Sequence, residues 1–200
     1  MMLPTHAVVG LALATPLAVI APEFATAVLT GGLVGGILPD LDLYAGHRRS
    51  LHYPTGYTLV AVAVGLVAAL YQTQLLAALA FLFVGAAAHC RMDRYGGGLE
   101  LRPWEGTSEK AVYDHVRGRW RTPKRWIPYD GSPGDIVLLG AVAVPLALVL
   151  DSPFRWVPPV ALIAGCTYGL LRRRLADLAP AVFERVPDSV SSYVPARYRQ

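Results

Sequence analysis

Six apolar runs, separated by short polar breaks, dominate the pattern of hydrophobic and polar positions along the chain. Residues 53–88 contain no Asp, Glu, Lys, Arg or His, and residues 7–39 contain a single charged residue, Glu23. Segments of this kind have nothing to present to water, so lipid is their natural solvent. The pattern therefore predicts six membrane-spanning helices, over roughly residues 7–21, 24–38, 55–71, 74–89, 136–150 and 156–171.

Several of these runs have only about 15 residues, fewer than the ~20 that cross a ~30 Å hydrocarbon core. Interfacial residues or local thinning of the bilayer would make up the difference; re-entrant pairs, or helices packed inside the bundle, are the alternatives. We predict an all-α, polytopic membrane helical bundle of about six transmembrane helices. Residues 1–171 form its membrane-embedded domain, which includes a cytoplasmic segment at 90–135, and residues 172–200 form a cytoplasmic or interfacial tail.

The composition agrees with a membrane protein. Of the 200 residues, 54% are hydrophobic and 16% are charged, whereas a typical soluble domain is about 25% charged. The two cysteines provide no disulfide framework, and Cys90 is predicted to be a small buried residue at a helix end. The first apolar run has no Lys or Arg before it, unlike a secretory signal peptide, so we expect a retained first helix.

The basic residues fall on one side of the predicted bundle. With the N-terminus in the cytoplasm, every Lys and Arg except Arg155 lies in the segments 1–6, 39–54, 90–135 and 172–200. The positive-inside rule then places both termini in the cytoplasm and the protein in the cell (inner or plasma) membrane. We interpret the net charge of +4 as orientation and contact with the anionic headgroups of membrane lipids, and expect no nucleic-acid partner.

Carboxylates and histidines follow the second apolar run on this cytoplasmic side. Asp40 and Asp42 end the run, and His47 and His52 come next in the loop. Carboxylates at such a position are costly unless they are solvated, paired or bound to a metal. Mixed nitrogen and oxygen ligands are typical of zinc, manganese and iron sites. The alternative is a solvated helix end and a basic interfacial loop whose histidines extend toward water.

The first and fourth runs contribute further candidates. His89 and Asp93 are four residues apart at the end of the fourth run, so they share one helix face. His6 stands at the start of the first run. Because a four-helix bundle brings such helix ends together, we predict a metal site at the cytoplasmic rim.

Two further features have open interpretations. The second run contains Gly31-Gly32-Leu33-Val34-Gly35-Gly36, which lets helices approach closely and leaves room for the site beyond it. The segment 90–135 contains Asp114-His115 among Trp, Tyr and Arg residues. Its arginines are candidates for holding a phosphate, and the alternative is a surface segment anchored at headgroup level. No G-x-S-x-G elbow and no phosphate-binding loop is present, so neither serine hydrolysis nor ATP use is supported.

The order of these residues resembles the YdjM-like family of membrane-bound metal-dependent hydrolases. The resemblance covers about residues 1–105 and rests on His6, Pro39-Asp40-Leu41-Asp42, His47-Arg48 with His52, and Gly85-x-x-x-His89-x-x-x-Asp93. Tyr53 stands where the family usually has a serine. The family is itself distantly similar to zinc-dependent phospholipase C and the P1-type nucleases.

The resemblance implies one or two divalent ions, most simply Zn²⁺, with Mn²⁺ or Fe²⁺ as alternatives. The main shell would be His52, His89 and Asp93 with Asp42 or Asp40. His6 would serve a second ion bridged by Asp93, and His115 is a candidate for a third. Where Asp40 is not a ligand, it is a catalytic candidate as general base or as the group that orients a ligand histidine. Arg48 is the candidate cation for an anionic substrate group.

These residues favour a metal-dependent hydrolase at the cytoplasmic membrane face. A phosphoester is the expected substrate, and a phospholipid fits the depth of the site. A transporter or channel is the first alternative, although a conduit would place polar residues at the middle of the helices. A membrane scaffold with a structural metal in a closed shell is the second.

Overall fold

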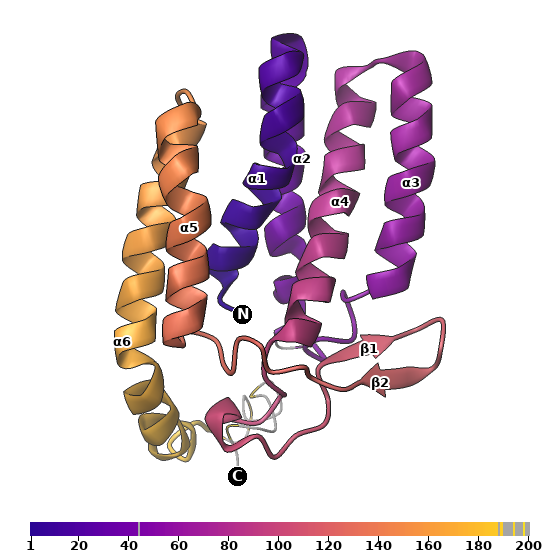
Figure 1. Cartoon of the computed structure of the whole chain (residues 1–200). Coiled ribbons are helices and arrows are strands. Elements are labelled where there is room, and N and C mark those ends of the chain that lie inside the picture. Colours follow the sequence, from indigo (N-terminus) through magenta and orange to yellow (C-terminus); the bar gives the residue numbers. More distant parts are fainter. Residues whose placement is uncertain (44, 188, 190–193, 195–197, 199–200) are drawn as a thin grey trace.

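Six long helices stand side by side in the computed structural model, and the longer loops and a small hairpin gather at one end of them (Figure 1). The structure describes residues 1–43, 45–187, 189, 194 and 198. The helices are α1 (Leu3–Ile20), α2 (Ala25–Ile37), α3 (Pro54–Tyr71), α4 (Gln74–Tyr95), α5 (Pro133–Val149) and α6 (Val157–Phe183). The strands are β1 (Val112–Asp114) and β2 (Arg119–Arg121), and 3-10 turns occupy Pro22–Phe24, Leu38–Asp42, Pro103–Glu105 and Phe154–Trp156.

The prediction of an all-α membrane bundle is confirmed. Among the described residues, five segments are long and apolar enough to cross a membrane: Leu3–Ile20, Pro22–Asp42, Pro54–Tyr71, Gln74–Tyr95 and Phe154–Phe183. The sixth helix, α5, has 17 residues, which at 1.5 Å per residue is roughly 26 Å. It falls a few ångströms short of an average hydrocarbon core, a difference that local thinning of the bilayer can absorb.

Helix α2 lies between α1 and α4 with almost no side chains in between. A Cβ atom added to Gly35 would lie 2.0 Å from the carbonyl oxygen of Leu82 in α4. One added to Gly32 would lie 2.4 Å from the carbonyl oxygen of Gly10 in α1. Small residues thus let the three backbones touch, as they do in many membrane helix pairs. This contact holds the ends of α1, α2 and α4 close together at the loop-bearing end.

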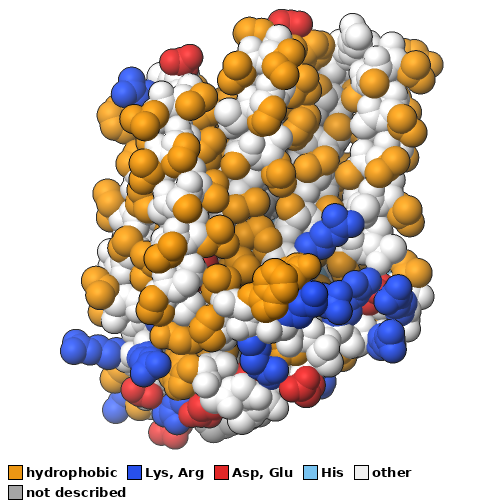
Figure 2. Space-filling view, viewed as in Figure 1, with side chains coloured by type: hydrophobic (Ala, Val, Ile, Leu, Met, Phe, Trp, Pro, Cys, Tyr) orange, Lys and Arg blue, Asp and Glu red, His pale blue; other side chains and the backbone are white. Residues whose placement is uncertain are grey.

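Basic side chains gather at that same end. Figure 2 shows Lys and Arg over the loops and hydrophobic side chains over the helices. Helix α6 continues past the boundary expected at residue 171, through Arg172, to Phe183. Arg197 and Arg199, which belong to the predicted basic tail, lie outside the described residues.

The hairpin in segment 90–135 is a feature that the sequence analysis did not predict. Its two strands pair antiparallel, with Tyr113 opposite Trp120. The buried Asp114 carboxylate accepts hydrogen bonds from Arg121 Nε (2.9 Å) and from the backbone of Val116 (3.1 Å). Burial alone would raise the pKa of Asp114, but the hydrogen bonds from Arg121 and the turn outweigh it and leave the pKa lowered. The carboxylate is therefore ionised and fixes the turn.

The start of α5 is fastened to α1. Ser132 Oγ accepts a hydrogen bond from the backbone N–H of Asp135 (3.3 Å) and so caps the N-terminus of α5. The buried Asp135 carboxylate in turn accepts from Thr5 Oγ1 and from the backbone N–H of Met2, both at 2.8 Å. This contact holds the first turn of α1, which carries His6, in place.

Candidate metal centre

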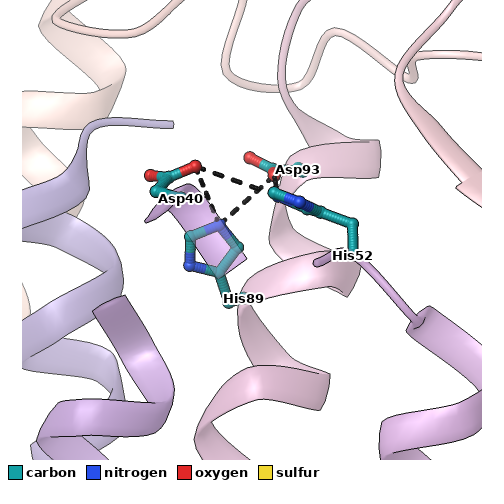
Figure 3. A group of neighbouring side chains, drawn as sticks. All are labelled: Asp40, His52, His89 and Asp93. Carbon is teal, nitrogen blue, oxygen red and sulfur yellow. Dashed lines mark hydrogen bonds and ion pairs between the residues drawn. The ribbon is translucent and has the colours of Figure 1, made fainter. Parts of the chain in front are cut away.

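Four side chains from distant parts of the sequence point toward one another at the loop-bearing end (Figure 3). Asp40 comes from the turn after α2, His52 from the loop before α3, and His89 and Asp93 from the last turns of α4. One ligand atom from each of the four lies within 4.8 Å of all the others. The i, i+4 spacing on α4 places its two members on one face, as the sequence predicts.

The separations between these ligand atoms match a small tetrahedral ion. His89 Nε2 lies 3.3 Å from Asp40 Oδ1 and 3.4 Å from Asp93 Oδ2. His52 Nε2 lies 3.8 Å and 3.1 Å from the same two atoms. Bonds of about 2.1 Å in a tetrahedron separate neighbouring ligands by about 3.4 Å. These four separations are close to that value and the other two pairs lie within 4.8 Å, so small side-chain shifts would bring all four residues around a Zn²⁺-sized ion.

The outer nitrogen of each histidine is held by a partner, so the inner nitrogen is directed at the cluster. His89 Nδ1 donates to the carbonyl oxygen of Gly36 (2.7 Å), and His52 Nδ1 donates to Asp42 Oδ2 (2.9 Å). Each Nε2 is then left unprotonated in the neutral ring, which is the form that binds a metal. The Nε2 of His89 is buried and has no hydrogen-bond partner. Buried acceptors usually have a partner, and this nitrogen, which faces two carboxylates, is suited to a cation as its partner.

Asp42 lies behind this cluster and organises the loop that carries His52. Besides His52, its carboxylate accepts from the backbone N–H groups of Leu51 (3.1 Å) and Arg48 (3.3 Å) and lies 3.1 Å from His47 Nδ1. The sequence analysis left Asp40 and Asp42 open as alternatives for the main shell. The geometry brings Asp40 into the ligand group, whereas Asp42 lies behind His52 and accepts a hydrogen bond from its Nδ1.

The charge of the cluster also favours a cation. Burial alone would lower the pKa of His52, but its contacts with Asp42 and Asp93 outweigh burial and raise it above the ordinary value. The carboxylates therefore stabilise a positive charge at this point. A metal ion bound between them would supply that charge in place of a proton.

His6 and Arg48 lie on the other side of Asp93. His6 Nε2 is 3.2 Å from Asp93 Oδ1, and its ring stacks on His89 with centroids 3.7 Å apart. Arg48 Nη2 is 3.7 Å from the same oxygen, while its Nη1 donates to the carbonyl of Gly97 (2.8 Å). Arg48 is buried and has a positive φ of 60°, an unusual backbone for a non-glycine residue. Its guanidinium is thus held beside Asp93 by the fold.

Three other candidates lie outside the ligand group. His47 contacts Asp42, and His115 is exposed on the hairpin, where its Nε2 lies 2.7 Å from the carbonyl oxygen of Arg49. Cys90 is buried. The hydrogen bond from His89 Nδ1 to the Gly36 carbonyl could not be predicted from the sequence, because every residue has a backbone carbonyl. The only sequence signal was the glycine pattern that brings α2 against α4.

A substitution at Asp42 tests whether this residue orients His52 rather than binding the metal itself. Asp42→Asn keeps all four ligands but weakens the hold on His52 Nδ1, and partners of this kind typically contribute 10–100-fold in metal affinity. We expect an affinity loss of about that size, measured by competition with a chromogenic chelator. His47→Ala, which removes a neighbour outside the ligand group, is expected to have a smaller effect. Equal losses in the two variants would contradict the assignment.

Comparison with known proteins identifies the family of this chain. A family model described as YdjM inner membrane protein matches residues 1–175. Curated proteins and solved structures give no match to this chain. The matched range includes His6 and the whole cluster and ends within α6. Since it covers most of the 200 residues, the chain belongs to the family of YdjM inner membrane proteins.

Proposed function

We propose that the protein is a membrane-bound metal-dependent hydrolase that cleaves a phosphoester at the cytoplasmic face of the membrane. The observation that carries the proposal is the convergence of Asp40, His52, His89 and Asp93 at ligand-to-ligand separations of 3.1–3.8 Å. The tethered Nδ1 atoms of both histidines support it. Structural and catalytic metal sites can both have such a ligand set. The argument for catalysis therefore rests on whether water and substrate can reach the metal site.

Among the four residues of the cluster, Asp40 is the one whose side chain reaches the surface of the described structure. The side chain of Asp40 is 21% exposed, whereas those of His52, His89 and Asp93 are at most 2% exposed. A structural site typically closes around its ion, while a catalytic site keeps an open position for water or substrate. Access beside Asp40 therefore favours catalysis, and Asp40 acts as a ligand in this proposal.

A zinc, manganese or iron ion held here would supply Lewis acidity and an activated water to a phosphoester. The chain's own residues favour a single ion. The Oδ1 of Asp93 offers a second position with His6, but the guanidinium of Arg48 already lies 3.7 Å from that oxygen. Repulsion from a fixed positive charge disfavours another dication there. Arg48 thus positions Asp93 in this proposal, and its role as a substrate-binding residue stays a prediction.

A lipid phosphoester is the proposed substrate. Leu41, directly after Asp40, is an exposed large hydrophobic side chain. The cluster lies at the ends of membrane-spanning segments, where phosphate headgroups are found. The positive-inside rule supports a cytoplasmic location for this end.

The test is turnover by the purified full-length protein in lipid nanodiscs. The protein is stripped with a chelator, reloaded separately with Zn²⁺, Mn²⁺ or Fe²⁺, and offered phospholipids and a water-soluble phosphodiester. We expect product only after reloading, and faster cleavage of the lipid. Stoichiometric metal without turnover of any phosphoester would contradict the hydrolase and leave the metal a structural role.

A further inference from the structure

The β1–β2 hairpin carries exposed positive charge that the described residues neutralise only in part. Its one carboxylate, Asp114, is already bound by Arg121 at 2.9 Å. Arg117 reaches Asp114 only at 3.9 Å, and its side chain is 61% exposed. Arg119 is exposed and forms no ion pair with any described residue. The hairpin therefore presents two guanidinium groups to its surroundings, that of Arg117 in its turn and that of Arg119 at the start of β2.

Aromatic side chains connect this turn to the first residue beyond His52. Tyr113 packs edge-on against Trp120 (5.5 Å between centroids) and against His115 (4.9 Å). His115 in turn stacks on Tyr53 (4.3 Å). Two more cations lie over this row, Arg49 at 4.6 Å from the Tyr113 ring and Lys110 at 5.9 Å from the Trp120 ring. Tyr and Trp mixed with Lys and Arg are typical of surfaces at the headgroup level of a bilayer.

The hairpin lies where lipid headgroups are expected. It extends beneath the first turn of α3 (Figure 1), and Figure 2 shows basic side chains at that edge of the molecule. Among the residues of α3, only Pro54 is buried. Lipid therefore covers the faces of α3 that α4 does not, and the headgroups of that leaflet come to stand beside the hairpin.

Hydrogen bonds join the hairpin to the loop that carries His52. The backbone N–H of Tyr113 donates to the carbonyl of Arg48 (2.9 Å). The ring of His115 lies 2.7 Å from the carbonyl of Arg49. Thr55 Oγ1 donates to Asp114 Oδ1 (3.4 Å) on the other side of the loop. A force that fixes the hairpin consequently fixes the backbone on both sides of His52.

We propose that the hairpin binds the headgroups of anionic phospholipids through Arg117 and Arg119, and that this binding holds the loop 47–52 in place. The lipid binding is independent of the proposed function. Its consequence for the metal centre rests on that function, because His52 is one of the four ligands. The proposed binding partner of the hairpin is the surrounding lipid leaflet, since positive charge at headgroup level is complementary to anionic lipid.

Lipid binding is tested on the full chain by native mass spectrometry from micelles that contain equal amounts of phosphatidylglycerol and phosphatidylcholine. We expect the wild type to retain phosphatidylglycerol preferentially. The R117Q/R119Q variant should bind it about 25-fold more weakly, since each basic residue near the surface contributes roughly fivefold. R155Q, which removes an arginine at the opposite end of the bundle, is the matched control and should bind like wild type.

Each contrary result overturns the assignment. Equal retention of the two lipids by the wild type would exclude selectivity for anionic lipid. Unchanged binding by R117Q/R119Q, or equal loss in R155Q, would exclude the hairpin as its site. A dimer mass that R117Q/R119Q abolishes would identify a second copy of the chain as the occupant.

The effect on the loop is read by hydrogen exchange in nanodiscs, which needs neither metal nor turnover. Amides of residues 45–53 should exchange more slowly in phosphatidylglycerol than in phosphatidylcholine, and R117Q/R119Q should remove the difference. Identical exchange in the two lipids would overturn the coupling even if lipid binds. Because this measurement uses the metal-free protein, its outcome is separate from success or failure of the proposed hydrolase.

Discussion

His89→Ala is expected to lower metal content from about one ion per chain to background and to abolish any metal-dependent turnover. The substitution removes an Nε2 that lies 3.3 Å and 3.4 Å from two carboxylate ligands. Loss of a direct ligand should exceed the 10–100-fold typical of an outer partner. The measurement is elemental mass spectrometry of the detergent-purified protein, beside the apparent affinity for Zn²⁺.

The matched control for this experiment is His115→Ala. His115 is also a histidine at the loop-bearing end, but it is exposed and lies outside the ligand group. Its removal should leave the metal content unchanged. Asp93→Ala should behave like His89→Ala, since Asp93 Oδ2 lies within 3.4 Å of both ligand histidines. A folded His89→Ala protein with a full complement of metal would exclude the cluster as the site.

Hydropathy was enough to predict the helical bundle. Lipid is the solvent of the helices, so long apolar runs in the sequence mark them directly. The long uncharged stretch 53–88 becomes α3 and most of α4. The periodic spacing of His89 and Asp93 was likewise sufficient to place both on one helix face. In an α-helix, residues four apart in the sequence are neighbours on one face, so their spacing alone predicts the contact.

The choice between Asp40 and Asp42 could not be made in the same way. Both follow Pro39 within one short 3-10 turn, and residue type does not distinguish a ligand from the partner of a ligand. The choice depends on the path of the loop, which brings His52 Nδ1 to Asp42 Oδ2 at 2.9 Å. A tertiary contact between loop residues has no periodic signal, so the structure was needed to see it.

The hairpin was missed for a related reason. Each strand has three residues, and the turn between them is basic and polar. Alternation over so few positions is not distinguishable from an irregular loop. What stabilises the hairpin is the buried Asp114 with Arg121, together with the contact to Arg48. These interactions join residues whose relation is visible only in space.

Gly35→Ala is expected to destabilise the protein strongly, although alanine is the better helix former by about 1 kcal/mol. The added Cβ would lie 2.0 Å from the carbonyl oxygen of Leu82, a backbone atom that cannot turn away. Overpacking of a tight interface typically costs 1–3 kcal/mol, and a clash between backbones should reach the upper end. At about 2–4 °C per kcal/mol, the thermal midpoint in detergent should fall by roughly 6–12 °C.

The matched control is Gly65→Ala on α3, where an added Cβ meets nothing within 4 Å. Its thermal midpoint should be unchanged or slightly raised. The two variants differ further at the metal centre, because separation of α2 from α4 moves the Gly36 carbonyl away from His89 Nδ1, which it holds at 2.7 Å. Gly35→Ala should therefore weaken metal binding even at temperatures where it stays folded. Wild-type stability and affinity in Gly35→Ala would show that the close contact of α2 and α4 is not what sets the site.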